Sequence, residues 1–234
     1  MHLKIDIPQK DTRLAYLCGV LAGDGYIKIR RLKNEYHLFC AGNPADEQQY
    51  YQNVIAPQLN AIFSIMISPK MLCTGRLYGI SIYSKQIVEY LLSIGLQESP
   101  KMDIRVPDWI KSDDLLFASY LRGFADTDFS YKFRKEIYPI ISGCSRSSNI
   151  IHEIGSFLLK KGFKPTLCQY HVPDLRNEKG YTTINRIDLN GTKNFTLWMS
   201  LVATSHPKNI IKINRYKEKV AGDGFEPPIF TLQS

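Results

Sequence analysis

Residues 16–26 read YLCGVLAGDGY, and residues 120–130 read YLRGFADTDFS. In each stretch, apolar residues recur at the spacing of a helix and lead directly into a carboxylate, Asp24 in the first and Asp128 in the second. Each stretch also carries glycine and alanine, and such small residues let the backbones of two helices approach closely. The two stretches therefore predict a pair of similar helices that pack tightly and carry an acid at their C-terminal ends.

The order of elements predicted after the first stretch recurs after the second. Each motif helix is followed by an alternating two-stranded pattern, a second helix, two more strand-like stretches and a third helix. In the first half these cover residues 12–23, capped by Asp11 or Thr12, then 26–42 with a turn near Lys33–Asn34, 45–63 bent or ended around Pro57, 61–70 with 76–84, and 84–95 capped by Ser84. In the second half they cover 113–126, 128–144, 147–161, 164–172 with 180–190, and 192–203.

The spacing of matching residues indicates a duplicated chain. Asp24 and Asp128 lie 104 positions apart, and so do Cys40 and Cys144. A period this long excludes a solenoid. We therefore expect an α/β (α+β) fold of two pseudo-symmetric αββαββα halves, which form a saddle of antiparallel sheets. The predicted parts are an N-terminal half (1–96), a linker (97–112), a C-terminal half (113–220) and an irregular tail (221–234).

The composition is that of a basic globular protein. The 234 residues are 44% hydrophobic and 22% charged, and a chain of this length can bury a sizeable core. An excess of 30 Lys and Arg over 22 Asp and Glu gives a net charge of +8, for which a polyanion such as nucleic acid or a membrane surface is the usual partner. No apolar run is long enough to cross a bilayer and the first residues lack the core of a signal peptide, so we expect no membrane partner.

The cysteines and histidines show no metal-binding pattern. The five cysteines are an odd number without ligand spacing, so we expect buried, reduced thiols and an intracellular protein, in the cytoplasm or with the host DNA of an organelle or nucleoid. None of the five histidines is assigned a catalytic role. His206 lies beside Lys208 and could line a site, although a surface position is favoured. Trp109 and Trp198 are expected to pack.

Two acids at the ends of packed helices have a chemical consequence. A helix C-terminus carries partial negative charge, so a carboxylate there is unfavourable unless a cation lies nearby. Two such acids that converge would repel each other unless a divalent metal ion neutralised them. Mg²⁺ prefers such hard oxygen ligands, and carboxylate-held Mg²⁺ is a common means of hydrolysing a phosphodiester.

The stretches LCGVLAGDG (17–25) and LRGFADTDF (121–129) both resemble the nine-residue motif that names the LAGLIDADG homing endonucleases. The spacing and the element order over residues 12–216 resemble the single-chain members with two motifs, especially the compact ones encoded in archaeal introns. The resemblance implies a monomeric DNA endonuclease that uses Mg²⁺, with Mn²⁺ as a substitute.

The family's functional positions can be carried over to this sequence. The metal-binding acid at the eighth motif position corresponds to Asp24 and Asp128, and the carbonyl before it to Gly23 and Thr127. The basic residue that lies near each scissile phosphate corresponds to Lys101 in SPK and Lys208 in HPK, where it would orient water or offset developing charge. A polar residue at the end of the second strand corresponds to Asn43 in the first half and to Ser145 or Arg146 in the second.

Two departures from the family motif concern the site. Ala22 replaces the acid at the sixth position, whereas Asp126 keeps it in the second copy. Phe129 replaces the glycine that follows the second acid, where glycine would ease a left-handed turn at the helix end. Phe129 therefore implies altered local geometry, and it leaves open whether both strands are cut equally, only one strand is nicked, or cleavage is lost.

The strands are predicted to supply the DNA-reading surface, because a two-stranded ribbon fits the major groove of B-DNA and alternation leaves one face for it. By alternation, Lys28 and Arg30 fall on one face of the first ribbon, with Arg31 and Lys33 opposite. The candidates in the first half are Lys28, Arg30, Arg31, Lys33, Asn43, Lys70, Arg76 and Tyr78. Those in the second half are Lys132, Arg134, Lys135, Arg146, Gln169, His171, Arg176, Lys179, Tyr181 and Arg186.

The sequence therefore predicts a homing endonuclease that makes a Mg²⁺-dependent double-strand break in a long duplex DNA site. Two other functions remain open. An RNA-splicing maturase uses the same fold to bind intron RNA and need not cleave DNA, and the basic surface does not separate RNA from DNA. A non-cleaving DNA-binding protein is the third possibility, although it would have no need of both acids.

Overall fold

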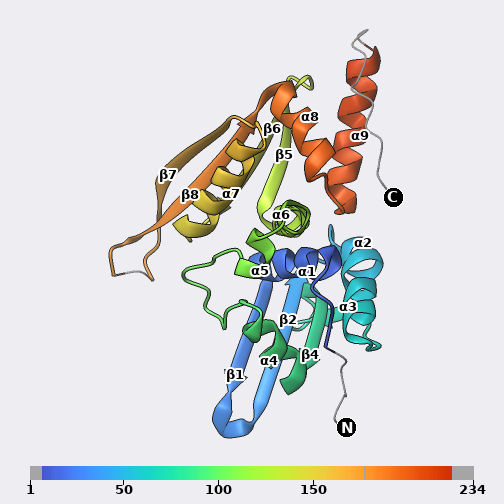
Figure 1. Ribbon diagram of the computed structural model, residues 1–234, viewed down its shortest axis with the longest axis vertical. Coiled ribbons are helices and arrows are strands. Elements are labelled where there is room, and N and C mark those ends of the chain that lie inside the picture. The colour runs from blue at the N-terminus through green and yellow to red at the C-terminus, as the bar shows by residue number, and fades with distance from the viewer. Residues whose placement is uncertain (1–6, 177, 223–234) are drawn as a thin grey trace. The chain divides into compact units, whose positions relative to one another are not determined.

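The computed structural model describes residues 7–176 and 178–222, and it divides into two compact units (Figure 1). Unit 1 comprises Met1–Lys101, Val106–Thr127 and Ser205–Lys208, and unit 2 comprises Met102–Arg105, Asp128–Thr204 and Asn209–Ser234. This division differs from the repeat, because the second motif helix packs with the first and joins unit 1. Of the predicted tail, residues 223–234 lie outside the described residues.

Unit 1 contains a four-stranded antiparallel sheet in the order β1-β2-β4-β3. In chain order its first hundred residues form α1 (Thr12–Gly23), β1 (Gly25–Arg30), η1 (Arg31–Lys33), β2 (Glu35–Gly42), α2 (Gln48–Tyr50), η2 (Tyr51–Ile55), α3 (Ala56–Phe63), β3 (Lys70–Leu72), β4 (Leu77–Tyr83) and α4 (Lys85–Ser93). The helices cover the sheet face that carries buried Leu38, Cys40 and Ile80. Asp11 caps α1 and Ser84 caps α4 through side-chain oxygens, as predicted.

The two motif helices pack against each other within unit 1 through reciprocal glycines. α6 (Asp114–Asp128) lies in this unit up to Thr127. A methyl group built on Gly19 would lie 2.0 Å from the carbonyl oxygen of Tyr120, and one on Gly123 would lie 2.0 Å from that of Tyr16. Each pair of residues is related to the other by the offset of the repeat. The predicted close packing of the motif helices is therefore present, and glycine at both positions is what permits it.

Unit 2 contains the second sheet, also antiparallel, in the matching order β5-β6-β8-β7. Its elements are β5 (Phe129–Arg134), β6 (Tyr138–Ser145), α7 (Ser148–Lys160), β7 (Pro165–Pro173), β8 (Tyr181–Asn190), α8 (Gly191–Leu201) and most of α9 (Pro207–Gly222). Trp198 on α8 is fully buried and donates a hydrogen bond to the hydroxyl of Tyr131 (2.9 Å). The predicted αββαββα order and fold class are confirmed in both halves.

Some elements differ from the sequence-based prediction. The helix around Pro57 does not end there, because a π-helical stretch, η2, passes directly into α3. The strand predicted over 61–70 is wrong except at Lys70: α3 runs to Phe63, and Asn60 holds the following loop through both backbone groups of Ile67. The helices α5 (Asp108–Lys111) and α9 were not predicted.

The cysteines only partly follow the prediction. Cys18 and Cys40 are buried, whereas Cys73, Cys144 and Cys168 are exposed, so the expectation of buried thiols is wrong for these three. Cys73 lies in the β3–β4 turn with a left-handed backbone (φ 51°), and the other two face away from the helical core of unit 2. No helix in the described part of the chain is both long and apolar enough to cross a membrane.

Candidate functional site

The C-terminal end of α1 carries the first motif acid and a lysine ammonium. Asp24 is the C-cap residue, and its N–H donates to the carbonyl of Val20 (3.0 Å). The Nζ of Lys101 donates to the carbonyl oxygens of Leu21 (3.0 Å), Ala22 (2.7 Å) and Gly23 (2.6 Å). Lys101 thus supplies positive charge where the last carbonyls of α1 carry partial negative charge. The predicted lysine and the predicted acid occupy the same end of this helix.

The oxygen atoms at this helix end fit a hard divalent cation. The Gly23 carbonyl and the Asp24 carboxylate are the ligand types that Mg²⁺ prefers, and a cationic group already contacts the former. Among the described residues, no three His, Cys, Asp or Glu side chains gather as a metal site. Mg²⁺ does not require such a cluster, because it commonly uses one or two carboxylates together with water and substrate phosphates.

A second group of charged side chains lies where β2 ends. Glu47 accepts a hydrogen bond from the N–H of Asn43 (2.7 Å) with Oε2, and its Oε1 lies 3.9 Å from Nε2 of His206. Lys208 forms an ion pair with Asp46 (2.7 Å). The HPK segment from the second half of the chain therefore belongs to unit 1 and lies beside residues of the first half. His206 is only 3% exposed, so the favoured surface position is wrong; its ring stacks on Tyr50 (4.4 Å between centroids).

Asp24 and Glu47 both lie close to one buried pair of side chains. The thiol of Cys40 is 3.6 Å from the hydroxyl of Tyr51. Burial is the main cause that raises the pKa of Cys40 to about 12; the charges of Asp24 and Glu47 contribute to this rise, while Tyr51 and Lys101 oppose it. Burial also raises the pKa of Tyr51, with smaller contributions from Cys40 and the same two carboxylates. We call Asp24, Glu47, Lys101 and Lys208 the first-half site, because the charges of the first three act on this buried pair and that of Lys208 acts on Glu47.

The sequence did not single out Glu47. It was expected only within a helix, whereas its carboxylate folds back over Gly42, where a methyl group would lie 1.4 Å from Oε2. The predicted Asn43 instead uses its side-chain oxygen to accept from the N–H of Ala45 (2.9 Å). A glycine at a strand end followed closely by a carboxylate is the local signal that could have indicated this arrangement.

The end of the second motif differs from that of the first. Asp128 is the last residue of α6, Phe129 begins β5, and Thr127 donates its hydroxyl to the carbonyl of Phe124 (2.9 Å). Phe129 is buried and stacks on Trp198 (5.6 Å between centroids). That Asp24 and Asp128 share metal ions, with Gly23 and Thr127 as further ligands, stays a prediction.

The expectation of a left-handed glycine after the motif acid is wrong. Gly25 does not have a positive φ. Its role is steric, because a methyl group at Gly25 would lie 2.4 Å from the carbonyl oxygen of Leu21. The second half accommodates a phenylalanine at the matching position, so the two helix ends have different local geometry.

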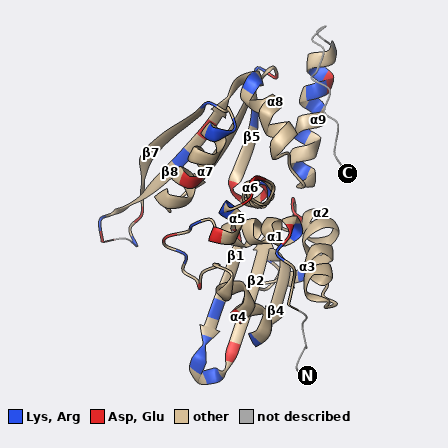
Figure 2. Cartoon of the chain, viewed as in Figure 1, with Lys and Arg blue, Asp and Glu red and all other residues tan. Residues whose placement is uncertain are grey.

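The outer face of the unit 1 sheet, opposite its helices, carries part of the predicted DNA-reading set. The register places Lys28 opposite His37 and Arg30 opposite Glu35, and Lys70 lies on this face opposite Gly79. Lys and Arg gather at the turn end of the β1–β2 hairpin (Figure 2). His37, which the sequence did not single out, also lies on this face; it stacks on Tyr83 (4.2 Å between centroids) and lies 2.8 Å from the hydroxyl of Ser81. Burial lowers the pKa of His37.

The unit 2 sheet presents a comparable outer face. The register places Lys132, Arg134 and Arg186 on it. The guanidinium of Arg186 is held by Asp188 (2.8 Å) and by the hydroxyl of Ser142 (3.3 Å). Arg146 follows β6 and donates to the hydroxyl of Thr182 (3.3 Å).

Three candidates of the second half lie on the other face of this sheet: Gln169, His171 and Tyr181. Gln169 pairs in register with buried Asn185 and donates to its side-chain oxygen (2.6 Å). His171 pairs with Thr183, which lies two residues from Asn185 on the same strand and therefore on the same face of the sheet. The expectation that they share a face with Arg186 is therefore wrong.

Several basic candidates lie in turns instead of on strand faces. The predicted placement of Arg31 and Lys33 on a ribbon face is wrong, because both belong to η1, which the left-handed Asn34 closes. Arg76 ends the β3–β4 turn, with its N–H directed to the carbonyl of Cys73. The turns that join β5 to β6 and β7 to β8 contain Lys135, Arg176 and Lys179.

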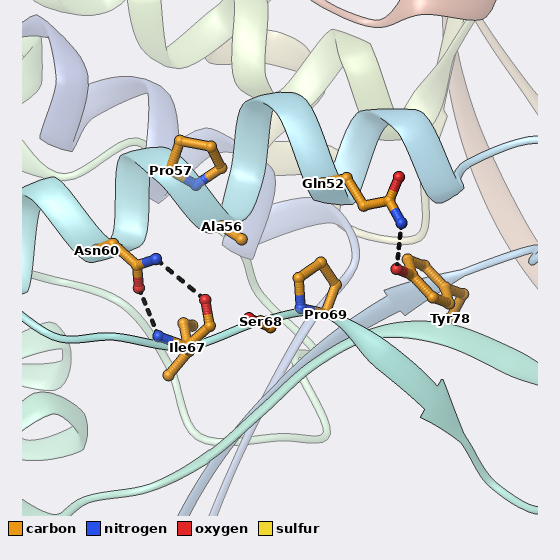
Figure 3. A pocket seen from close by; sticks show the side chains of 8 residues that line it. All are labelled: Gln52, Ala56, Pro57, Asn60, Ile67, Ser68, Pro69 and Tyr78. Carbon is orange, nitrogen blue, oxygen red and sulfur yellow. Dashed lines mark hydrogen bonds between the residues drawn. The ribbon is translucent and has the colours of Figure 1, made fainter.

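Tyr78 is not on the outer face. It is 8% exposed and accepts a hydrogen bond from Gln52 on the helical side of the sheet (2.8 Å). There it lines an open pocket of about 390 Å³ (Figure 3). The other lining residues are Gln52, Ala56, Pro57, Asn60, Ile67, Ser68 and Pro69. Tyr78 is therefore excluded from the sheet surface predicted to read DNA.

A pH prediction follows from Glu47. Its pKa is lowered from 4.5, mainly by its interaction with the imidazole of His206, while burial opposes the shift and the N–H of Asn43 adds to it. A carboxylate with a depressed folded-state pKa stabilises the fold above its unfolded pKa, and this is lost as the pH falls through the folded value. Glu47→Gln should therefore be less stable than the wild type at neutral pH, and the difference should shrink below about pH 4.5. Urea unfolding at several pH values measures it; a difference that is equal at neutral and acidic pH would contradict the arrangement.

Comparison with known proteins places this geometry in a known fold. No family model and no curated protein sequence matches the chain. Solved structures do match. The homing endonuclease I-DmoI, in a complex with DNA and Mn, aligns with a TM-score of 0.58 and 14% identity over 85% of this chain and 99% of that one. Its complex with DNA and Ca has the same TM-score at 11% identity, over 87% and 97% of the two chains.

A second homing endonuclease also aligns with nearly the whole sequence. I-WcaI, bound to its DNA recognition sequence, aligns over 97% of this chain and 89% of its own, with a TM-score of 0.52 and 15% identity. Both relatives are single-chain LAGLIDADG homing endonucleases. The chain has the fold of that class, and the resemblance inferred from the two motifs is confirmed at this level.

Proposed function

We propose that this chain is a site-specific DNA endonuclease that binds a long duplex as a monomer and cuts both strands. The observation that carries the proposal is the close packing of α1 and α6 through Gly19 and Gly123, since each of these helices leads into a motif acid. The fold is shared with endonucleases that were solved on DNA, and the basic outer faces of the two sheets provide contacts to phosphates and bases.

The proposed cofactor is Mg²⁺, with Mn²⁺ as a substitute. Gly23 and Asp24 in the first half, and Thr127 and Asp128 in the second, would hold it. When bound, it would supply Lewis-acid stabilisation of the phosphate. Lys101 and Lys208 would offset charge that develops on the phosphate oxygens. The structures of I-DmoI with Mn, Ca and Mg support a divalent ion in this fold.

The test uses a DNA duplex of the protein's own locus. If the reading frame lies in an intron, this duplex is the host gene without the intron. Purified protein is incubated with this duplex and Mg²⁺, with and without EDTA. A defined double-strand break that EDTA abolishes is the expected result. Rescue of splicing without cleavage would assign an RNA maturase instead, and a mobility shift alone would assign a DNA-binding protein without nuclease activity.

A further inference from the structure

A chain of buried polar groups in unit 1 connects the second motif to the HPK segment. The hydroxyl of Tyr16 donates to Oδ2 of Asp126 (2.8 Å), and the N–H of Ser205 donates to the same oxygen (3.0 Å). The hydroxyl of Tyr50 lies 2.9 Å from that of Tyr16. All these contacts lie within unit 1. Tyr16, Tyr50 and Asp126 are each at most 5% exposed, so a partner lost here would leave a buried polar group unsatisfied.

The direction of these hydrogen bonds is fixed by the number of protons. Tyr16 gives its only hydroxyl proton to Asp126, so Tyr50 must donate to Tyr16. Burial raises the pKa of both tyrosines well above 10, and both therefore remain donors at any ordinary pH. The order of donation is Tyr50 to Tyr16 to Asp126, with Ser205 donating to Asp126 from the other side.

The same chain of contacts ends at the first-half site. The ring of Tyr50 stacks on His206, whose Nδ1 accepts from the N–H of Lys208 (3.2 Å). His206 in turn faces Glu47, and Lys208 pairs with Asp46. The segment Ser205–Lys208 is thus held at its start by Asp126 and along its length by Tyr50, and its lysine is presented to acids of the first half.

The matching segment in the first half is held in a different way. Ser99 bonds the backbone of Ile27 through both its N–H (2.8 Å) and its hydroxyl oxygen (3.2 Å), and Glu98 accepts from the N–H of Ile29 (3.0 Å). This segment is therefore attached to the edge of β1. The residue of the first copy that matches Asp126 is Ala22, whose methyl side chain cannot accept a hydrogen bond from the segment.

We propose that Asp126, Tyr16 and Tyr50 form a positioning network that fixes Lys208 in the first-half site, beside Asp46 and Glu47. The lysine of the second half of the chain then works with the acid of the first half, Asp24. This inference rests on the proposed nuclease function. It predicts that loosening the network slows the cleavage of one DNA strand and leaves the other strand unaffected.

The test compares Asp126→Asn and Tyr50→Phe with Tyr131→Phe as a matched control. Tyr131 is also a buried tyrosine whose hydroxyl makes two hydrogen bonds, to Trp198 and to the carbonyl of Ala203, but it lies in unit 2. Hydrogen exchange of the Ser205 and Lys208 amides reports the position of the segment without any need for cleavage. Strand-resolved cleavage of an end-labelled duplex reports the function.

In the two network variants, we expect faster exchange at both amides. We also expect one strand to be cut about 10- to 100-fold more slowly, so that nicked DNA accumulates; this range is typical of groups that orient other functional groups. Tyr131→Phe should keep the wild-type ratio of the two strands. Unchanged amide exchange in Asp126→Asn, or equal slowing of both strands, would overturn the proposal. If the wild type cuts no DNA, the nuclease function fails, while the exchange result still decides whether the network positions Lys208.

Discussion

Replacing Asp24 by asparagine should abolish double-strand cleavage and leave DNA binding nearly intact. The substitution keeps the shape of the side chain but removes the negative charge that would hold a divalent ion at the end of α1. Metal ions contribute several kcal/mol of transition-state stabilisation, so the loss should be on the order of a thousandfold in the rate of cutting. Binding should persist, because the basic outer faces of the sheets are unchanged. Cleavage of a plasmid target and a gel-shift titration measure the two properties separately.

Asp128→Asn should likewise abolish double-strand cleavage. Each acid is proposed to serve the cutting of one DNA strand, and a double-strand break requires both strands to be cut. Asp108→Asn is the matched control: its side chain is fully exposed on α5, where it pairs with Lys111 (3.4 Å), and it should cut at the wild-type rate. Robust Mg²⁺-dependent cutting by the variant that lacks both motif acids would refute the catalytic assignment.

The fold was predictable from the sequence because its decisive contacts are encoded in the repeat. Gly19 and Gly123 occupy the same motif position, and each meets the backbone one turn earlier in the other helix. The two motif stretches contain all four residues of these reciprocal contacts, so the packing of the two helices can be predicted from the motifs alone. Strand alternation likewise placed Lys28, Arg30 and Lys132 on the outer faces.

The parts of the site that were missed depend on fits between distant segments. His206 is buried because the ring of Tyr50, more than 150 positions earlier, stacks on it, and nothing in the local sequence HPK indicates this. Glu47 belongs to the site because Gly42 leaves space for its carboxylate. Turns were a second source of error. The alternating sequence pattern predicted that Arg31 and Lys33 lie on a strand, whereas both belong to a short 3-10 helix that the left-handed Asn34 closes.

Replacing Gly19 or Gly123 by alanine should destabilise the protein strongly. The added methyl group would lie 2.0 Å from a carbonyl oxygen of the partner helix, and the backbone there cannot move aside as a flexible side chain could. Alanine itself favours a helix over glycine by about 1 kcal/mol. The steric cost should exceed that gain, because forcing extra atoms into a packed interface costs about 1–3 kcal/mol and more where backbone must shift. We expect a net loss of about 2 kcal/mol or more in the free energy of unfolding, measured by urea denaturation.

Gly155→Ala separates this steric effect from helix propensity. Gly155 also lies inside a helix, α7, but the nearest atoms that a methyl group there would meet are side-chain methyl groups, those of Leu167 at 3.4 Å and of Ile187 at 3.8 Å. Gly155→Ala should therefore leave the free energy of unfolding unchanged or raise it by up to about 1 kcal/mol. If Gly19→Ala and Gly123→Ala were stabilised to the same degree as Gly155→Ala, α1 and α6 could not be in backbone contact. The proposal that both motif acids serve one site would then lose its support, because that proposal rests on the packing of these two helices.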